Sequence, residues 1–372
     1  MAEGHGAGAR MIPLRITAEV EGSRDPFIAR LNRDAGLRET PHDVILSEIG
    51  PDGAAYEGLA GTVRLRGLLP LESDGDVLLV LPERGIAHRL IRASSPHNTL
   101  VITERCDQTC VMCSQPPKRH HVDLFGLFET AALLAPPGAT IGLSGGEPTL
   151  YKTELFAFLH TVLQARPDLS FHILSNGQHF TEADLPALRA LPRNGQLWGI
   201  PIYAADPGLH DRIVGKAGAF ENLLDGLSLL CRAGAAVELR TVVMTDNAQH
   251  LPVLARFVAS HVPFAVHWAI MQLENIGFAR QYWDKLFFDN SAEFTPVAEA
   301  TDIARACGVN TFLYNFPLCT VPVRYRSLAV PAISDWKRRY MEFCASCSGR
   351  NLCGGFFEWH PMDRSFSHAG PL

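Results

Sequence analysis

The chain has 372 residues, of which 47% are hydrophobic and 19% are charged, and its formal net charge is −6. This composition is typical of a folded protein with a large apolar core, and the length exceeds that of one ordinary domain. The net negative charge argues against a nucleic acid partner. Because the sequence shows no apolar run of 18 residues and no secretory signal, we expect no membrane span and a cytoplasmic location. Its nine cysteines are then expected to be thiols or metal ligands rather than disulfides.

The N-terminal part of the sequence carries short strand signals. Residues 1–12 are rich in glycine and alanine, and we expect them to be disordered. Residues 13–94 hold apolar runs separated by turn sequences, among them 43–47, 62–66 and 76–81. The pattern predicts a small β-rich N-terminal domain that supports the main one.

From residue 95 to 290, apolar strands alternate with amphipathic helices. Six strands are predicted, at 99–103, 140–144, 170–175, 197–203, 237–243 and 265–270. A strand followed each time by a helix indicates a parallel sheet of the α/β class with right-handed crossovers. Six such units are fewer than the eight of a closed β/α barrel, so the sequence predicts a partial, open TIM-like barrel.

Three cysteines follow the first of these strands with C-x3-C-x2-C spacing, namely Cys106, Cys110 and Cys113. Cysteine sulfur is the soft ligand that iron–sulfur clusters and zinc prefer. A structural zinc site or an electron-transfer cluster takes four protein ligands, whereas three thiolates leave one metal position open. The loop therefore predicts an open metal–sulfur centre. Chance thiols, or part of a zinc site completed elsewhere, are the alternatives.

Glycine-rich or polar turns follow several of the other predicted strands. They are Ser144–Pro148, Ser175–Gly177, Arg240–Thr241 and Glu274–Arg280. Each turn taken singly also fits an ordinary strand-to-helix connection. Because the carboxyl ends of parallel strands share one edge of the sheet, we expect these turns to lie on the same rim as the cysteine loop.

The cysteine loop and the glycine turn together resemble the radical S-adenosylmethionine (SAM) superfamily. The three cysteines match its C-x3-C-x-aromatic/apolar-C signature, with Met112 where an aromatic residue is commonest. The turn matches the motif that binds the amino group of SAM, and its residues are Gly145, Gly146, Glu147 and Pro148. The resemblance covers about residues 95 to 290.

This resemblance implies a cofactor and a reaction. A 4Fe-4S cluster on the three cysteines would bind SAM at its fourth iron and cleave it to a 5′-deoxyadenosyl radical, which abstracts hydrogen from an unactivated C–H bond. By the same resemblance, Ser175 and Asn176 would lie near the ribose of SAM and Arg240 near its carboxylate.

A second cysteine set lies in residues 291–372. Cys344, Cys347 and Cys353 are close in sequence, and Cys319 lies upstream as a fourth ligand. Four thiolates suit either zinc or a 4Fe-4S cluster, and spacing does not separate the two. The pattern resembles the auxiliary-cluster extensions of peptide-modifying radical SAM enzymes, which favours one auxiliary 4Fe-4S cluster over zinc.

Other reactive side chains receive more ordinary interpretations. Cys231 and Cys307 continue apolar helix stripes and are predicted to be core residues. Four side chains at or near strand ends are predicted to line a substrate cavity, namely Tyr203, Arg212, His267 and Trp268.

A narrower resemblance, from about residue 80 onward, is to the His-Xaa-Ser system radical SAM maturases, and specifically to the C member of that pair. It rests on Val111–Lys118, Ile333–Lys337 and Cys353–Phe357. It implies modification of a ribosomally made precursor peptide or His-Xaa-Ser repeat protein, together with a companion radical SAM maturase and a reductant such as flavodoxin or ferredoxin. The alternatives are a radical SAM enzyme acting on a small metabolite or RNA, and a non-catalytic cluster-bearing partner of the companion maturase.

Overall fold

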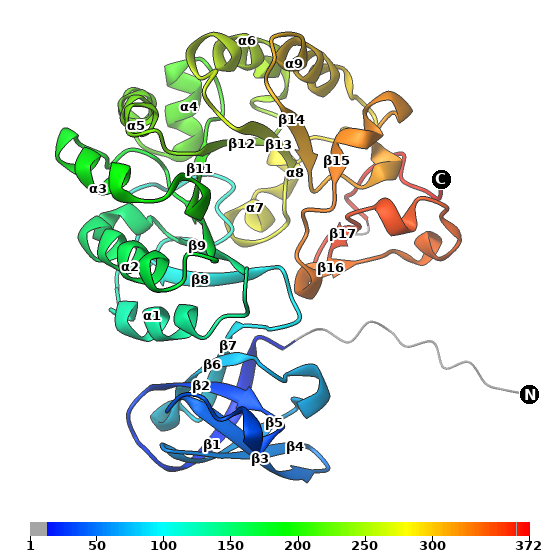
Figure 1. The fold of residues 1–372 in the computed structure, drawn as a ribbon. Coiled ribbons are helices and arrows are strands. Elements are labelled where there is room, and N and C mark those ends of the chain that lie inside the picture. Colours follow the sequence, from blue (N-terminus) through cyan, green and yellow to red (C-terminus); the bar gives the residue numbers. More distant parts are fainter. Residues whose placement is uncertain (1–12, 362) are drawn as a thin grey trace, which may run out of the picture. The chain divides into compact units, whose positions relative to one another are not determined.

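A computed structural model describes residues 13–361 and 363–372 (Figure 1). The segment 1–12, predicted to be disordered, lies outside the described residues. The chain divides into two compact units. The first extends to Ile102 and adds Asp123–Leu143 and Thr153–Phe171, and the second comprises Thr103–Val122, Ser144–Lys152 and His172–Leu372. Within the described residues, no helix has the length and apolar character needed to cross a membrane.

Seven strands of the first unit close into a small barrel with the order β1-β5-β4-β3-β2-β6-β7. Strands β2 and β3 pair in parallel, and the other pairs are antiparallel. Alternate side chains point inward, so that Ile16, Tyr56 and Leu65 are fully buried. This barrel confirms the predicted β-rich N-terminal fold. Its strands are Arg15–Gly22, Phe27–Asn32, Asp43–Gly50, Gly53–Gly58, Gly61–Arg66, Val77–Leu81 and Ile86–Ile91 for β1 to β7.

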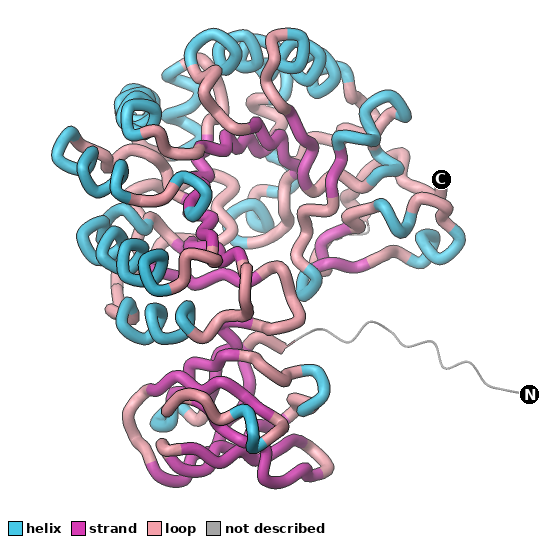
Figure 2. Tube along the Cα trace, in the orientation of Figure 1, coloured by secondary structure: helices cyan, strands magenta, loops and turns pink. Residues whose placement is uncertain are grey.

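The main sheet has eight strands in the order β15-β14-β13-β12-β11-β10-β9-β8 (Figure 2). The six predicted strands correspond to β8–β13, which confirms the parallel α/β fold, and β14 and β15 extend the sheet beyond them. The sheet keeps β8 and β15 as its two edges, as in a partial TIM-like barrel. The bounds are Asn98–Thr103, Thr140–Gly145, Ser170–Leu174, Gln196–Pro201, Val237–Val243, His267–Gln272, Thr311–Tyr314 and Ala329–Val330 for β8 to β15.

Helices connect these strands, and in the second unit α4, α5, α6 and α9 lie on the outer side of β11–β14 (Figure 1). Helix α5 buries Phe220, Leu223 and Leu227 and ends at Gly234 in the left-handed conformation. The helices are Phe125–Leu133, Lys152–Ala165, Leu185–Ala190, Pro207–Val214, Ala219–Ala233, Leu251–His261, Gly277–Gln281, Trp283–Leu286 and Thr295–Ala306 for α1 to α9.

The predicted burial of two cysteines is wrong. Both Cys231 and Cys307 are exposed. In α5 the buried stripe passes from Leu227 to Leu230, because a helix repeats every 3.6 residues, and Cys231 falls beside it. Cys307 follows the last buried residue of α9, Ala304, at the point where the helix ends.

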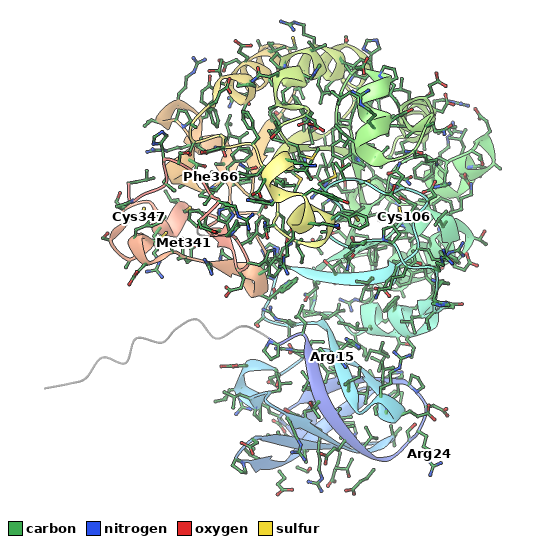
Figure 3. The ribbon with its side chains drawn as sticks, turned by 180° about the vertical axis from the view of Figure 1, so that it is seen from behind. Arg15, Arg24, Cys106, Met341, Cys347 and Phe366 are labelled. Carbon is green, nitrogen blue, oxygen red and sulfur yellow. The ribbon has the colours of Figure 1, made fainter. Side chains whose placement is uncertain are left out.

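The C-terminal segment adds a two-stranded sheet, β16 (Arg338–Arg339) with β17 (Phe356–Phe357). A small apolar cluster of Met341, Cys344, Phe356 and Phe366 forms its core. Figure 3 shows Met341, Cys347 and Phe366 together in this segment, well away from Cys106.

Candidate active site

A cavity of about 280 Å³ lies at the carboxyl ends of strands β9 to β14, and all the residues that line it belong to the second unit. The loop after β8, the end of β9 and the end of β10 each contribute side chains or backbone to its wall. Ten of the eleven predicted binding residues of the SAM site line it, namely Cys106, Cys110, Met112, Cys113, Gly145, Gly146, Glu147, Ser175, Asn176 and Arg240. Pro148 does not; it begins the short helical turn that leaves the cavity.

Backbone contacts on its outer side hold the cysteine loop in place. The N–H groups of Thr109 and Val111 donate to the carbonyl oxygens of Val214 and Ile213 at 3.0 and 2.9 Å. The carbonyl oxygen of Cys113 accepts from the N–H of Phe278 at 2.9 Å. These three hydrogen bonds therefore tie the loop to the end of α4 and to the start of α7.

Two of the three cysteine thiols have acceptor oxygens within reach. The thiol of Cys113 donates to the carbonyl oxygen of Gln115 at 3.0 Å, and that of Cys110 lies 3.5 Å from Oε1 of Gln108. Burial raises the pKa of Cys106 to about 11 and that of Cys110 to about 12, and neighbouring negative groups act in the same direction. Such thiols lose their protons only beside a strong positive partner such as a metal ion.

The glycine turn after β9 lies against the cysteine loop with no room for a side chain. A Cβ on Gly146 would overlap the carbonyl oxygen of Arg105. Its N–H donates to Thr103 O and the N–H of Glu147 donates to Arg105 O, both at 2.7 Å. The residue type is thus required by the close approach of two backbones.

Glu147 is fully buried, and its carboxylate accepts four hydrogen bonds. Thr149 donates from its N–H at 2.9 Å and from its hydroxyl at 2.5 Å. Ser175 donates its hydroxyl at 2.8 Å and Asn176 its N–H at 2.5 Å. Burial raises the pKa of Glu147, while the four donors favour its ionised form. The carboxylate therefore joins the ends of β9 and β10.

Asn176 also connects to the cysteine loop. Its side-chain amide donates to Asp107 at 3.0 Å, and Asp107 forms an ion pair with Lys216 and lies 3.2 Å from Nε2 of His179. Burial acts to raise the pKa of Asp107, but the bonds from His179 and Lys216 outweigh burial and lower it. The loop that carries the cysteines is thereby tied to the turn after β10.

Arg240 reaches the cavity from β12 and is held there by Glu238. Its Nη1 atom lies 3.2 and 3.1 Å from the two carboxylate oxygens. Glu238 also contacts His172 on β10 and, at 3.3 Å, His267 on β13. Burial acts to raise the pKa of Glu238, but the charge of Arg240 and the two histidine contacts outweigh burial and lower it. The ion pair directs the Arg240 guanidinium to the cavity wall, where 20% of the side chain is exposed.

The opposite wall of the cavity is formed by the ends of β13 and β14. Glu274 lies there, paired with Lys337 at 3.2 Å, and burial raises the pKa of Glu274 against the opposing charge of Lys337. Asn315 lines the same wall with a left-handed φ of 66°, a conformation that costs energy in a residue other than glycine.

Sequence reasoning missed Asn315 and Glu238, because neither belongs to a motif, and it gave Lys337, the last residue of the 333–337 tract, no role in the site. Strand alternation was the available signal for Glu238, since it lies two residues before Arg240 and shares its face of β12. Of the four side chains predicted to line a substrate cavity, Tyr203 lines this one. Trp268 is fully buried, His267 faces Glu238, and Arg212 lies exposed on α4.

The four later cysteines are also brought together. The pKa values of Cys319 and Cys344 are raised by burial and then by the nearby Cys353. The sulfur of Cys353 accepts from the N–H groups of Leu318 and Gly355 at 3.4 and 3.3 Å. The sulfur of Cys347 accepts from the N–H of Leu372 at 3.4 Å.

A site for a single metal ion needs a different arrangement of side chains from a site for an iron–sulfur cluster. Within residues 13–361 and 363–372, no group of three or more Cys, His, Asp or Glu side chains is arranged to hold one metal ion. That finding concerns side chains gathered around one atom, whereas the thiolates of an iron–sulfur cluster bind different iron atoms.

Comparisons with known proteins agree with the fold. Residues 100–258 match the Radical SAM superfamily model, and this part of the chain is a radical SAM domain. None of the curated proteins matches the sequence.

Several solved structures resemble the chain. Streptococcus suis SuiB bound to S-adenosylmethionine has a TM-score of 0.48 and 13% identity, covering 60% of this chain and 51% of SuiB. Native anSMEcpe with bound AdoMet has a TM-score of 0.45 and 15% identity over 57% of this chain and 63% of its own. A domain of pyruvate-formate lyase-activating enzyme from Bacteroides vulgatus ATCC 8482 has a TM-score of 0.37 and 15% identity over 46% and 96%. The matched region thus spans about half the length of SuiB.

Proposed function

We propose that this protein is a radical SAM enzyme that holds a 4Fe-4S cluster on Cys106, Cys110 and Cys113 and cleaves SAM reductively. The observation that carries the proposal is the convergence of these cysteines, the Gly145–Glu147 turn and Arg240 on one cavity of the radical SAM domain. Three thiols without a fourth match a cluster that keeps one iron open for SAM.

The residues present fit this cofactor. The two glycines of the turn leave backbone exposed to the cavity, and the three cysteines line the same cavity. When bound, cluster and SAM supply a 5′-deoxyadenosyl radical, which removes hydrogen from a C–H bond that acids and bases cannot activate.

The residues of this chain would bind and orient SAM and shield the radical from water. Arg240 offers its guanidinium to a carboxylate, and Glu238 keeps that guanidinium in place. Glu147 fixes the turn that faces the amino group, since it bonds Ser175 and Asn176 beside the expected ribose position. Met112 and Leu273 give the cavity apolar surface that excludes water from a reactive radical.

The substrate we propose is a ribosomally made peptide or protein, with His-Xaa-Ser repeats as the specific candidate. Support comes from the sequence resemblance to the maturases and from the gathering of Cys319, Cys344, Cys347 and Cys353, which we assign to one auxiliary 4Fe-4S cluster. A companion maturase and a flavodoxin or ferredoxin in the cytoplasm complete this proposal. Zinc is the alternative there, but it would need the sulfurs gathered around one ion, an arrangement that the described residues do not show.

The test is anaerobic reconstitution followed by reaction with SAM and dithionite. We expect 5′-deoxyadenosine from the native protein and none from a Cys106→Ala variant. Co-expression with a His-Xaa-Ser repeat protein is then followed by mass spectrometry. A mass change that depends on Cys106 supports the peptide substrate. If SAM is cleaved but the peptide gains neither a crosslink nor an epimerised residue nor any other modification, the result would favour a small metabolite or RNA as substrate. No SAM cleavage at all would favour the non-catalytic partner.

A further inference from the structure

Gln108 lies in the cysteine loop between Cys106 and Cys110, and its side chain contacts one of the three sulfurs. Its Oε1 atom lies 3.5 Å from the sulfur of Cys110. The residue is only 4% exposed and lines the cavity. The side-chain amide is therefore held between the Cys110 sulfur and the wall of the cavity.

The side-chain amide of Gln108 is only half satisfied. The Oε1 atom accepts from the thiol of Cys110, but the buried Nε2 atom has no hydrogen-bond partner among the described residues. A buried donor without a partner costs free energy, so such atoms call for an explanation from the site around them.

A metal-bound Cys110 supplies that explanation. A ligating cysteine is a thiolate, which has no proton to give and acts only as an acceptor. Beside a thiolate, Oε1 has no proton to accept a hydrogen bond from, whereas Nε2 can donate one to the sulfur. The two atoms exchange places by a half turn of the terminal amide. The orphaned donor then bonds the Cys110 sulfur.

We propose that Gln108 is a positioning residue for the cluster, whose side-chain amide donates an N–H···S hydrogen bond to the Cys110 thiolate and thereby raises the reduction potential of the cluster. The proposal rests on the proposed function, because it requires a cluster on the three cysteines. Reduction adds negative charge that spreads onto the sulfurs, and a donor at sulfur stabilises the reduced form more than the oxidised one.

Gln178 offers a matched control. It is also a glutamine with an orphaned buried side-chain atom, in this case Oε1, but it does not line the cavity. If an unsatisfied side-chain amide reflected only loose packing, substitution of Gln178 and of Gln108 would change the midpoint potential of the cluster equally.

The experiment measures the midpoint potential of the cluster without SAM, by redox titration followed by electron paramagnetic resonance (EPR). A Cys344→Ala/Cys347→Ala parent removes the second site and its signal. We expect Gln108→Met and Gln108→Leu to shift the potential to more negative values, and Gln178→Met to leave it unchanged. A Gln108→Met potential equal to that of the parent overturns the proposal, as does an equal shift in Gln178→Met.

A second readout detects the hydrogen bond directly in the parent. In the parent labelled with glutamine ¹⁵N at the side-chain amide, pulsed EPR is expected to show a ¹⁵N coupling to the reduced cluster, and the Gln108→Met variant to lose it. Absence of the coupling from a parent that holds its cluster overturns the proposal. A parent that assembles no cluster overturns the proposed function instead, so the two failures are distinguishable.

Discussion

The two cysteine sets of this protein differ in what surrounds their sulfurs. Cys106, Cys110 and Cys113 line a cavity together with polar groups from the ends of other strands. Cys319, Cys344, Cys347 and Cys353 lie near one another instead, and Cys344 belongs to an apolar cluster that includes Phe356 and Phe366. Cys106 and Cys347 lie well apart in Figure 3.

The difference shows how one ligand chemistry serves two purposes. Three thiols at the rim of a parallel sheet leave room for an exchangeable ligand, and the rim supplies the groups that bind it. Four thiols can fill the ligand positions of a metal centre by themselves, so the proposed second site would retain its centre without an exchangeable ligand. Breaking each set separately tests this contrast.

The largest effect is expected from Cys110→Ser compared with Cys347→Ser. The first removes a ligand of the open site, so formation of 5′-deoxyadenosine should fall to background. The second removes a ligand of the closed site, so about half of the iron should be lost while SAM cleavage continues. Iron and sulfide analysis with a product assay measures both. Loss of SAM cleavage in Cys347→Ser, with the other cluster intact, would contradict the separation of roles.

Gly146→Ala is the next largest perturbation, because it forces a Cβ onto the carbonyl oxygen of Arg105 in the wall of the open site. We expect a loss of about 3 kcal/mol in the free energy of unfolding, since backbone has little freedom to move aside. Urea unfolding measures it. Gly126→Ala is the control, because nothing lies within 4 Å of the added Cβ, and a change there of similar size would show that the open site is not specially constrained.

Glu238→Gln should weaken SAM binding about tenfold without loss of the cluster, because it removes the charge-assisted bonds that aim Arg240 at the cavity. Equilibrium dialysis with SAM gives the affinity. Tyr314→Phe is the matched control, since its hydroxyl contacts His267 at 3.2 Å, one step further from Arg240. Equal affinities in the native protein and Glu238→Gln would show that Arg240 needs no such support.

The last effect depends on pH and concerns the C-terminal segment, where His360 stacks on Phe366 and lies 2.6 Å from the hydroxyl of Ser365. Burial, helped by Arg339, lowers the pKa of His360 to about 4 from its ordinary 6.5. Between these values the unfolded chain binds the proton and the folded chain does not. Stability is therefore complete above about pH 6.5 and is lost as the pH falls toward 4, by at most about 3 kcal/mol.

His360→Phe isolates this contribution. The difference in free energy of unfolding between this variant and the native protein should change between pH 6.5 and 4, because only the native protein carries the titrating imidazole. The Ser365 hydroxyl left without its partner adds an offset that does not depend on pH. Urea unfolding at several pH values measures the difference, and a flat difference from pH 7 to 4 would show that His360 titrates normally.

Much of the fold was predictable because local pattern and global structure agree. Apolar runs followed by amphipathic helices located β8–β13, and the cysteine and glycine motifs located most of the cavity wall. The short strands β14 and β15 were missed, because four and two residues give too little periodicity to detect.

The parts that were missed depend on long-range packing. Glu238 meets His172 across 66 residues of sequence, and Lys337 meets Glu274 across 63. Asn315 is recognisable only by its backbone angle, and Gln108 only by its missing partner. No single sequence shows which side chains the crossovers will bring together.

The central claim is that the three-cysteine site is open and binds SAM, whereas the four-cysteine site is closed. EPR of the reduced Cys344→Ala/Cys347→Ala protein, before and after addition of SAM, tests it most directly. We predict one 4Fe-4S signal whose g values shift when SAM is added. A signal that SAM leaves unchanged, or the absence of any cluster, would contradict the account.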